Sequence, residues 1–364
     1  MPWAGPKGSP GPDAPAGAAT GGETMADQGM QSPADAAAGQ PAGWPPAGPA
    51  GPRDWREEER IAEFTARLER GEKVEAGDWM PSEYRRQCLR LIQTHANSEI
   101  MGALPEREWI PRAPTLRRKL ALMAKVQDEV GHAQLIYRVA EDLAAPLGIT
   151  REDMMDALVA GKAKFHNVFS YPAPTWADAG IIAWLVDGAA LVTQAALLQT
   201  SYAPYARILR RICAEEAIHL KHGEDIILTL MSGTRAQQQM VQHALNRWWR
   251  PLLHFFGPPD EMSPNLEQAM KWRIKVRTNE ELRQEFLSKY VPQIRALGLQ
   301  IPDPELHYDE AQGRWVYGDP DWDEFWRVVK GQGPRTEARL AIRRLSHEES
   351  RWVREALARG AAAA

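Results

Sequence analysis

A repeated metal-ligand motif is the feature of this sequence that most restricts its fold. Glu129 and His132 form an E-x-x-H motif, and Glu216 and His219 form a second one. On a helix this spacing puts both side chains on one face, one turn apart, where a carboxylate oxygen and an imidazole nitrogen can bind the same metal ion. A single E-x-x-H is expected about once by chance in a chain of this length, so one motif alone would mean little.

Two further acids turn the two motifs into a pattern. Glu99 precedes Glu129 by 30 residues, and Asp187 precedes Glu216 by 29. The order acid, then E-x-x-H, therefore occurs twice at almost the same interval. Ferritin-like di-iron carboxylate bundles place an acid on each of two helices and an E-x-x-H on each of the other two. The pattern predicts an all-α protein, a ferritin-like four-helix bundle with two metal ions in its core.

Apolar periodicity, prolines and capping residues place the four helices. They are predicted over residues 82–104, 116–143, 176–201 and 205–231, with Pro105 ending the first. The connection over 146–174 is the long crossover that such a bundle needs between its helix pairs. Residues 179–198 are long and apolar enough to span a bilayer. Asp187 at the centre of this stretch favours a helix buried in the bundle instead.

Composition divides the chain into three parts. Residues 1–52 are rich in Ala, Gly and Pro and show no apolar period, which predicts a disordered extension without a catalytic role. Residues 53–255 are predicted to form the bundle, with additional helices at its two ends over 53–72 and 235–255. Residues 256–364 are predicted to be a C-terminal helical extension packed on the bundle or a partner, with helices over 266–297, 321–329 and 336–357 and a small hairpin over 306–317.

Net charge and cysteine content limit the partners and the compartment. A formal net charge of −4 over 364 residues gives no reason to expect nucleic acid or an anionic membrane as a partner. The two cysteines, Cys88 and Cys213, make no disulfide framework, and no charged-then-apolar leader opens the chain, so we expect a cytoplasmic protein. Tryptophans crowd the C-terminal half, and we expect them at an interface with another protein chain: Trp248, Trp249, Trp272, Trp315, Trp322 and Trp326.

Four carboxylates and two histidines form a hard, oxygen-rich ligand set, which suits iron or manganese better than zinc. We expect Glu129 and Glu216 to bridge two irons and to be the catalytic residues. The terminal ligands are expected to be Glu99 and His132 on one iron, with Asp187 and His219 on the other.

Several neighbouring residues allow two interpretations each. The short Asp187 indicates either an open, substrate-accessible position beside its iron or a third helix that lies closer. Asp128 and Glu215 each precede a motif by one residue, and they either orient the ligand histidines or form surface ion pairs. His95 either lines the pocket or is a core or interface histidine. Basic residues such as Arg90 and Lys125 either meet an anionic substrate or face solvent or a partner chain.

Longer motifs carry a resemblance to a known family. The chain resembles the catalytic alpha subunits of ring 1,2-phenylacetyl-CoA epoxidases over about residues 60–357. The motifs that carry it occur in order along the chain, at residues 78–81 (DWMP), 95–99, 113–119 (APTLRRK), 125–132, 184–190 (WLVDGAA), 200–202, 256–258, 263–265 and 291–293.

This resemblance implies a multicomponent di-iron monooxygenase that epoxidises the aromatic ring of phenylacetyl-CoA with O2 in phenylacetate catabolism. It implies two iron ions on this chain, with NADPH, flavin and an iron–sulfur cluster on a separate reductase. The complex would also contain a non-catalytic ferritin-like subunit, together with a small accessory subunit. The family's metal ligands fall on the six residues of the repeated pattern, and its CoA contacts fall on Arg90, His95 and Lys125.

Two other functions remain open. One is a different di-iron activity, such as that of a ferroxidase, a desaturase or a radical-generating reductase. A radical enzyme needs a tyrosine near the irons, and Tyr137, five residues beyond His132, points off the ligand face. The other is a non-catalytic scaffold subunit of the same fold, against which the six intact ligands argue.

Overall fold

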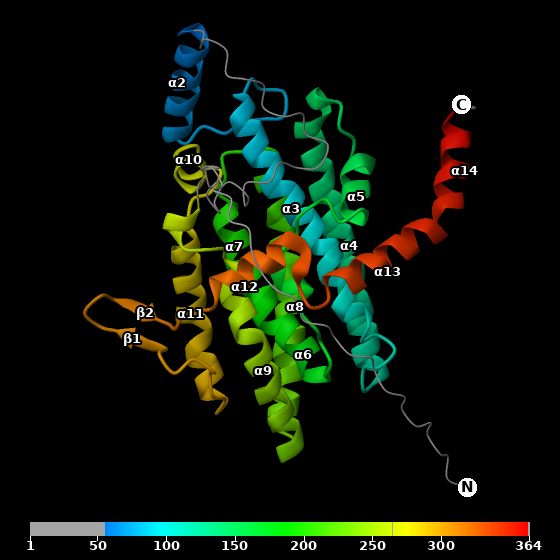
Figure 1. The fold of residues 1–364 in the computed structure, drawn as a ribbon, viewed down its shortest axis with the longest axis vertical. Coiled ribbons are helices and arrows are strands. Elements are labelled where there is room, and N and C mark those ends of the chain that lie inside the picture. Colours follow the sequence, from blue (N-terminus) through cyan, green and yellow to red (C-terminus); the bar gives the residue numbers. More distant parts are fainter. Residues whose placement is uncertain (1–54, 264, 363–364) are drawn as a thin grey trace, which may run out of the picture.

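A computed structural model describes residues 55–263 and 265–362 as an almost entirely helical protein (Figure 1). Among these residues the only sheet is a two-stranded hairpin, so the predicted all-α fold is confirmed. The extension predicted to be disordered, residues 1–52, lies outside the described residues. A first helix, α2 (Trp55–Glu69), leads into the bundle.

Four long helical segments form the bundle, as predicted for a ferritin-like fold. They are α3 (Ser82–Arg107), α4 (Leu116–Ala144), a composite segment made of α6 (Trp176–Ile181), η3 (Ile182–Val186) and α7 (Asp187–Leu197), and α8 (Ala203–Met231). Thr115 caps α4 by accepting a hydrogen bond from the backbone N–H of Arg118. The composite segment is long and apolar enough to cross a membrane, but 72% of its apolar window is buried inside the protein, as expected for a core helix.

The crossover between the two helix pairs is partly ordered by helical turns of its own. It contains η1 (Ala145–Leu147), α5 (Arg151–Val159) and η2 (Asn167–Ser170), and Thr150 and Asp153 form a capping box at the start of α5. The last of these turns brings Phe169 against α3 at Gly102, where an added Cβ would lie only 2.9 Å from the Phe169 ring. A glycine at this position therefore lets the crossover pack directly on the bundle.

The third segment contains a π-helical turn, which the sequence did not predict. This turn, η3, ends at Val186, immediately before the predicted ligand Asp187. Beside it, a Cβ on Gly223 of α8 would lie 2.2 Å from the Ala183 carbonyl carbon and 2.4 Å from the Trp184 nitrogen. The two backbones are thus in direct contact. Of the two interpretations of the short Asp187, this favours a third helix that lies close to its neighbour. Single π-helical turns of this kind are frequent at functional sites.

The first helix of the bundle is longer than predicted. Pro105 was expected to end it, but α3 continues to Arg107 with Pro105 inside. A proline so close to the carboxyl end removes at most one hydrogen bond of the last turn, so the helix can continue past it. The extra turn brings Glu106 onto the same face as Glu99, seven residues earlier, and Glu106 is buried.

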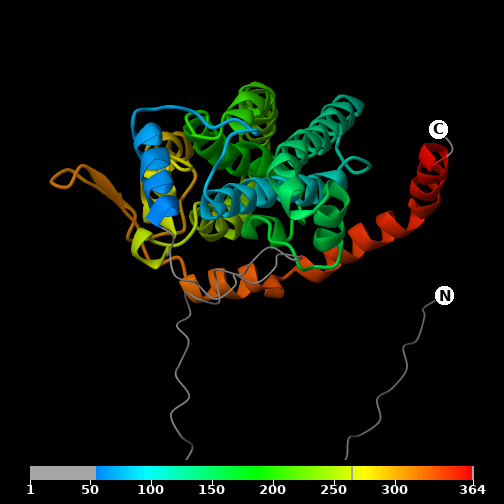
Figure 2. The ribbon, with the colours of Figure 1, turned by 90° about the horizontal axis from the view of Figure 1, so that it is seen from above.

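Two predicted C-terminal helices are each split in two. The helix predicted over 266–297 consists of α10 (Leu266–Lys271) and α11 (Asn279–Ala296), and between them Arg273 takes a left-handed φ of 51°. The helix predicted over 336–357 is divided at Ser350 into α13 (Thr336–Glu349) and α14 (Arg351–Ala362). Figures 1 and 2 show α13 and α14 extending away from the bundle as an arm.

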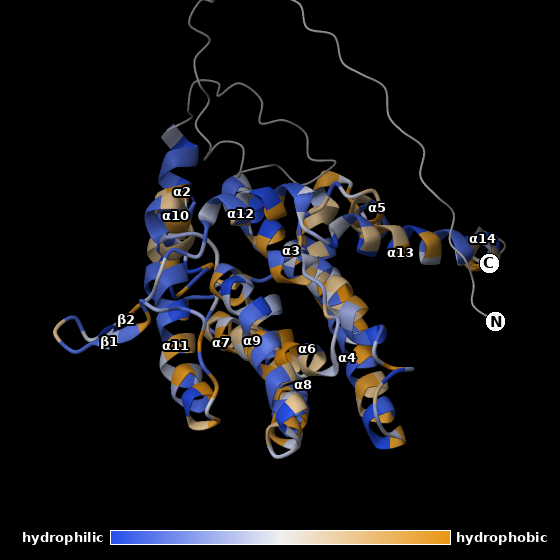
Figure 3. Ribbon diagram, turned by 60° about the horizontal axis from the view of Figure 1, so that its bottom comes forward, coloured by the Kyte–Doolittle hydropathy of each residue, from blue (hydrophilic) through white to orange (hydrophobic). Residues whose placement is uncertain are grey.

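The remaining elements match the sequence predictions. Helix α9 spans Arg235–Phe255, the hairpin pairs β1 (His307–Asp309) with β2 (Arg314–Val316), and a short helix, α12 (Trp322–Arg327), runs on into η5 (Val328–Gln332). The hairpin projects from the body and, like α2, is mostly hydrophilic (Figure 3).

The interface predicted from the crowded tryptophans is wrong for most of them. Trp248, Trp249, Trp272 and Trp315 are buried within this chain. One hydrophobic core continues from the third bundle segment through α8 and α9 to α11 and the hairpin, and it contains Trp248, Trp249 and Trp315. Trp272 packs in a second core, against Phe64 and Tyr84, so this chain covers all four rings itself. The division of the chain at residue 256 stays a prediction, because the two parts share the first of these cores.

Candidate metal centre

The six predicted ligands come together from all four segments of the bundle, and all six are buried. Their ligand atoms form two groups, and within each group the atoms lie within 4.8 Å of one another. The first group is Glu99, Glu129, His132 and Glu216, and the second is Glu129, Asp187, Glu216 and His219. Glu129 and Glu216 belong to both groups, so they lie where two metal ions would share ligands.

Each of the two histidines directs its Nδ1 atom into the cluster. His132 Nδ1 lies 3.5 Å from Glu99 Oε2 and 3.4 Å from Glu216 Oε1, and no hydrogen bond within the described part of the chain satisfies it. His219 Nδ1 lies 3.3 Å from Glu216 Oε2 and 3.5 Å from Glu129 Oε1. A buried polar atom without a hydrogen bond calls for an explanation, and a bound metal ion would supply one at His132.

The outer nitrogens of the two histidines are held by acids from the opposite motif. Glu215 Oε2 lies 2.8 Å from His132 Nε2, and Asp128 Oδ2 lies 3.2 Å from His219 Nε2. Of the two roles that the sequence left open for these acids, this geometry favours orientation of the histidines. Glu215 also accepts a hydrogen bond from Arg211. The acid that precedes each motif therefore orients the histidine ring of the other motif.

A buried lysine lies inside the carboxylate cluster. Lys125 Nζ lies 2.6 Å from Glu106 Oε2, 2.9 Å from Glu129 Oε1 and 3.0 Å from Asp187 Oδ2. Burial opposes its charge, but Asp187, Glu106 and Glu129 together hold the pKa of Lys125 well above its usual range. The cation offsets part of the negative charge that burial makes unfavourable.

Glu106 is the buried acid that the sequence analysis missed. Its signal was the spacing of seven residues from Glu99, which puts the two acids on one helix face. The expected helix end at Pro105 hid this relation.

The pKa values in the cluster show that a metal ion would have to displace protons from the two histidines. Burial raises the pKa of Glu99 and drives that of Asp187 well above its usual range. Burial alone would lower the pKa of each histidine, but the surrounding carboxylates raise it to about 11 for both His132 and His219. Without metal, protonated imidazoles therefore stabilise the acids. Metal binding must release these protons, because imidazole binds metal only when its ligating nitrogen is deprotonated.

The residues present fit a pair of metal ions. The donors are four carboxylates and two imidazoles, a set that suits iron or manganese. The shared acids and the inward-facing Nδ1 atoms give each of two positions a nitrogen and several oxygens. Which acid is terminal and which bridges stays a prediction.

His95 connects the first ligand to a buried hydrogen-bond network. Its Nε2 lies 2.7 Å from Glu99 Oε1, and its Nδ1 lies 2.6 Å from the hydroxyl of Tyr205. Gln194 Nε2 lies 3.3 Å from His95 Nε2. The sequence predicted His95 but not Tyr205 or Gln194, which come from helices that only folding brings beside α3. Arg90 is half-buried on α3.

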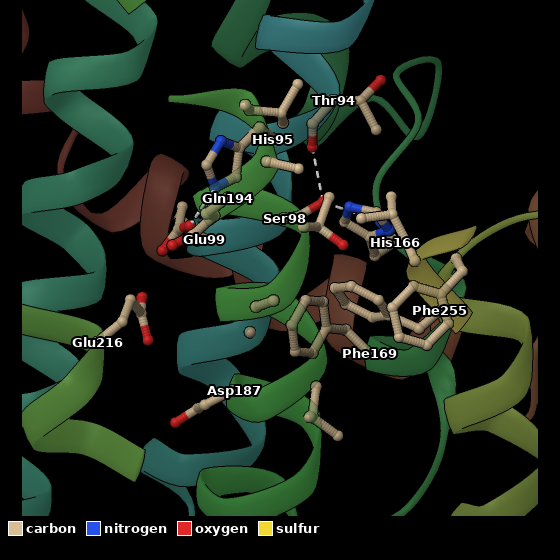
Figure 4. A pocket seen from close by; sticks show the side chains of 18 of the residues that line it. Thr94, His95, Ser98, Glu99, His166, Phe169, Asp187, Gln194, Glu216 and Phe255 are labelled. Carbon is tan, nitrogen blue, oxygen red and sulfur yellow. Dashed lines mark hydrogen bonds and ion pairs between the residues drawn. The ribbon is translucent and has the colours of Figure 1, made fainter. Parts of the chain in front are cut away.

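A cavity of about 160 Å³ opens onto the cluster. Figure 4 shows the carboxylates of Glu99, Asp187 and Glu216 on one side of it and the rings of Phe169 and Phe255 on the other. Its wall is mostly apolar, and further lining residues include Ile182, Val186, Leu197, Phe256, Lys275 and Arg277. Arg90 is not among the described residues that line it. A cavity of about 150 Å³ with apolar walls can bind benzene, so one aromatic ring fits here.

The fold and the site together define the class of this protein: a ferritin-like bundle with a buried carboxylate–histidine cluster able to hold metal ions. The chain belongs to the phenylacetic acid catabolic protein family, whose model matches residues 56–352. It is 48% identical over 301 residues to one of the subunits of the 1,2-phenylacetyl-CoA epoxidase of Escherichia coli (strain K12). This similarity covers 83% of the chain and 94% of that relative, and the family resemblance predicted from the motifs is thereby confirmed.

Proposed function

We propose that this chain is the oxygenase subunit of a multicomponent monooxygenase that epoxidises the aromatic ring of phenylacetyl-CoA in phenylacetate catabolism. The observation that carries the proposal is the cavity: it is large enough for one aromatic ring, and four of the six candidate ligands line it. The similarity to the epoxidase subunit supports the same substrate.

In this proposal two irons are held by Glu99, Glu129, His132, Asp187, Glu216 and His219. Bound there, the irons would supply O2 activation, with electrons from NADPH delivered by a separate reductase that carries flavin and an iron–sulfur cluster. The chain's own contribution is positioning. Glu129 and Glu216 would bind at both metal positions, and Glu215 and Asp128 orient the histidine rings.

The aromatic residues orient the substrate in this proposal. Phe169 and Phe255 lie across the cavity from the carboxylates (Figure 4), so an aromatic ring in the cavity would lie between these two side chains and the candidate metal ligands. The apolar wall keeps water away from the oxidant, which limits side reactions. Proximity of this kind can supply several kcal/mol of the barrier reduction.

The phosphate groups of CoA need cationic side chains near the mouth of the cavity. The structure changes which basic residues we propose for this role. Lys275 and Arg277, in the connection between α10 and α11, line the cavity, and burial lowers the pKa of Lys275 to about 8. Of the predicted contacts, His95 stays a proposed polar wall, and Arg90 stays a proposed contact farther out. Lys125 has three carboxylate partners, which favours a role within the cluster over a contact with CoA.

The relative is itself one component of a larger enzyme, which supports an assembly with other chains. We propose as partners a non-catalytic ferritin-like subunit, the reductase and a small accessory subunit. We further propose a cytoplasmic location, since both cysteines are free and CoA thioesters and NADPH are cytoplasmic metabolites.

The decisive assay combines this chain with the other components, reductase, NADPH and labelled O2, and analyses the products by mass spectrometry. We expect one labelled oxygen atom in the phenylacetyl-CoA product and no oxidation of free phenylacetate, because the CoA handle contributes binding energy that positions the ring. Metal content should be about two irons per chain. Equal turnover of the free acid, or an unlabelled thioester, would leave a metal-binding bundle of another function.

A further inference from the structure

The outer side of the two helices that carry the E-x-x-H motifs is exposed and apolar. Helix α4 presents Leu116, Leu120, Met123 and Val130 to solvent, and α8 presents Ile218; the exposed fractions are 71%, 56%, 55%, 38% and 69%. We call these five residues the α4–α8 face. In Figure 1 the first half of α4 runs along the edge of the molecule, below α13. The α4–α8 face is therefore open to a partner.

The sequence of α4 gives this face the geometry of a helix-packing seam. Its exposed positions 116, 120, 123, 127, 130 and 134 alternate in steps of four and three residues, which is the heptad spacing of a helix that packs along another helix. All six residues are uncharged, because Gln127 and Gln134 occupy the two positions that are not apolar. A solvated helix face normally carries charges at several such positions.

Small residues beside the seam allow a close approach. Ala124 and Gly131 of α4 and Ala214 and Ala217 of α8 are exposed, and a Cβ added to Gly131 would meet nothing within 4 Å. The backbone of a partner helix can thus come close at these positions, as small residues allow in other helix pairs.

The charges around the seam disfavour a second copy of this chain as the occupant. Arg117 and Arg138 are exposed near its two ends, and neither forms an ion pair with another described residue. If two copies packed with their α4 helices antiparallel and Ala124 opposite Gly131, Arg117 would face Arg138. In a parallel pair each arginine would face the same arginine of the other copy. Like charges at such positions are unfavourable, so acidic residues on the partner fit better.

We propose that the α4–α8 face is the docking surface for a long amphipathic helix of a different subunit, with an uncharged heptad face and acidic residues at its flanks. This inference rests on the proposed function, since it takes the partner from the multisubunit assembly. It also gives docking a consequence for the metal centre. Asp128 and Glu215, which hold the outer nitrogens of the ligand histidines, lie between these two helices with side chains 46% and 28% exposed.

Docking on this face would remove water from those two acids. Water competes with the imidazoles for the carboxylate oxygens, and a hydrogen bond shielded from water is stronger. The partner helix therefore tightens the orientation of both histidines and slows metal loss, without supplying a ligand itself.

The test measures binding between the full chain and the purified non-catalytic ferritin-like subunit of the same epoxidase by titration calorimetry and light scattering. Leu120→Asp and Met123→Lys place a charge in the seam, and Met262→Lys is the matched control, at a methionine 40% exposed outside the face. We expect each seam variant to bind at least about 30-fold more weakly, which corresponds to about 2 kcal/mol for an interface centre. The control should bind within about twofold of the unmodified chain. Circular dichroism checks that all variants are folded.

A second readout follows the loss of Mn²⁺ to a chelator in the same samples. The unmodified chain should lose metal more slowly when the partner is present, and the seam variants should show no such slowing. Equal binding by the seam variants, loss of binding in Met262→Lys, no complex with the unmodified chain, or a self-dimer that the seam variants abolish would each overturn the proposal. These measurements need no turnover, so a chain that docks its partner but does not oxygenate phenylacetyl-CoA would refute the proposed function alone.

Discussion

Replacing Gly223 by alanine tests whether the contact between α8 and the π-helical turn positions the metal centre. The new Cβ would lie 2.2 Å from the Ala183 carbonyl carbon and 2.4 Å from the Trp184 nitrogen. Both obstacles are backbone atoms of a helix, so no side-chain rotation can relieve them. An ordinary contact is at least about 3.4 Å, and the two helices must therefore separate by about 1 Å.

This separation has two measurable costs. Overpacking of a well-packed core destabilises by about 1–3 kcal/mol, occasionally more, and we expect the upper end because backbone must move. Since the unfolding entropy near 60 °C is about 2.1 cal/mol/K per residue, a loss of about 3 kcal/mol in a chain of this length should lower the melting temperature by roughly 4–5 °C. The displaced turn ends at Val186, next to Asp187. Since metal–ligand distances tolerate shifts of only about 0.2 Å, Mn²⁺ affinity at the Asp187 position should fall at least about tenfold.

The assay compares thermal unfolding of the metal-free chain by circular dichroism with Mn²⁺ binding by calorimetry. The matched control is Gly131→Ala, the same substitution in an exposed helix interior, where the new Cβ meets nothing within 4 Å. Alanine is the better helix former by up to about 1 kcal/mol, so this control should melt slightly higher and bind metal normally. If Gly223→Ala melted and bound Mn²⁺ like the unmodified chain, the argument that this contact positions Asp187 would be wrong.

Three further predictions concern the cluster and the N-terminus. Glu129→Ala or Glu216→Ala should leave a folded bundle with little iron and no oxygenation, because each acid belongs to both ligand groups; normal iron content in either variant would contradict the shared role. Metal binding should release protons and strengthen as pH rises, since the pKa values of His132 and His219 are raised to about 11 without metal. The same two groups stabilise the metal-free fold below their unfolded pKa of about 6.5, and this contribution should disappear as pH rises through about 11. Denaturant titrations of the metal-free chain check the pH dependence of its stability, and proton release in weak buffer checks the pH dependence of metal binding. A metal affinity that did not change with pH would refute the conclusion that the two histidines are protonated without metal. Deleting residues 1–52 should change neither melting temperature nor turnover, because their composition cannot form a core; a large drop in either would reveal a role for them.

The sequence by itself determined the candidate ligand set and the class of fold. A helix repeats every 3.6 residues, so the spacing within E-x-x-H fixes a shared face before any tertiary contact forms. The repeated interval from Glu99 and Asp187 to their motifs then required four helices facing one core. Thr115 is likewise a local signal, because a cap depends only on its own helix end.

Only the tertiary structure decided what surrounds those ligands. The exchange of acids between the motifs, with Glu215 on His132 and Asp128 on His219, depends on how α4 and α8 lie against each other. The same is true of Lys125, which the sequence could equally place on the surface or in the core. The π-helical turn before Asp187 arises where Gly223 lets two backbones touch. Contacts of this kind join residues far apart in the chain, and local periodicity carries no information about which distant residue fills a given space.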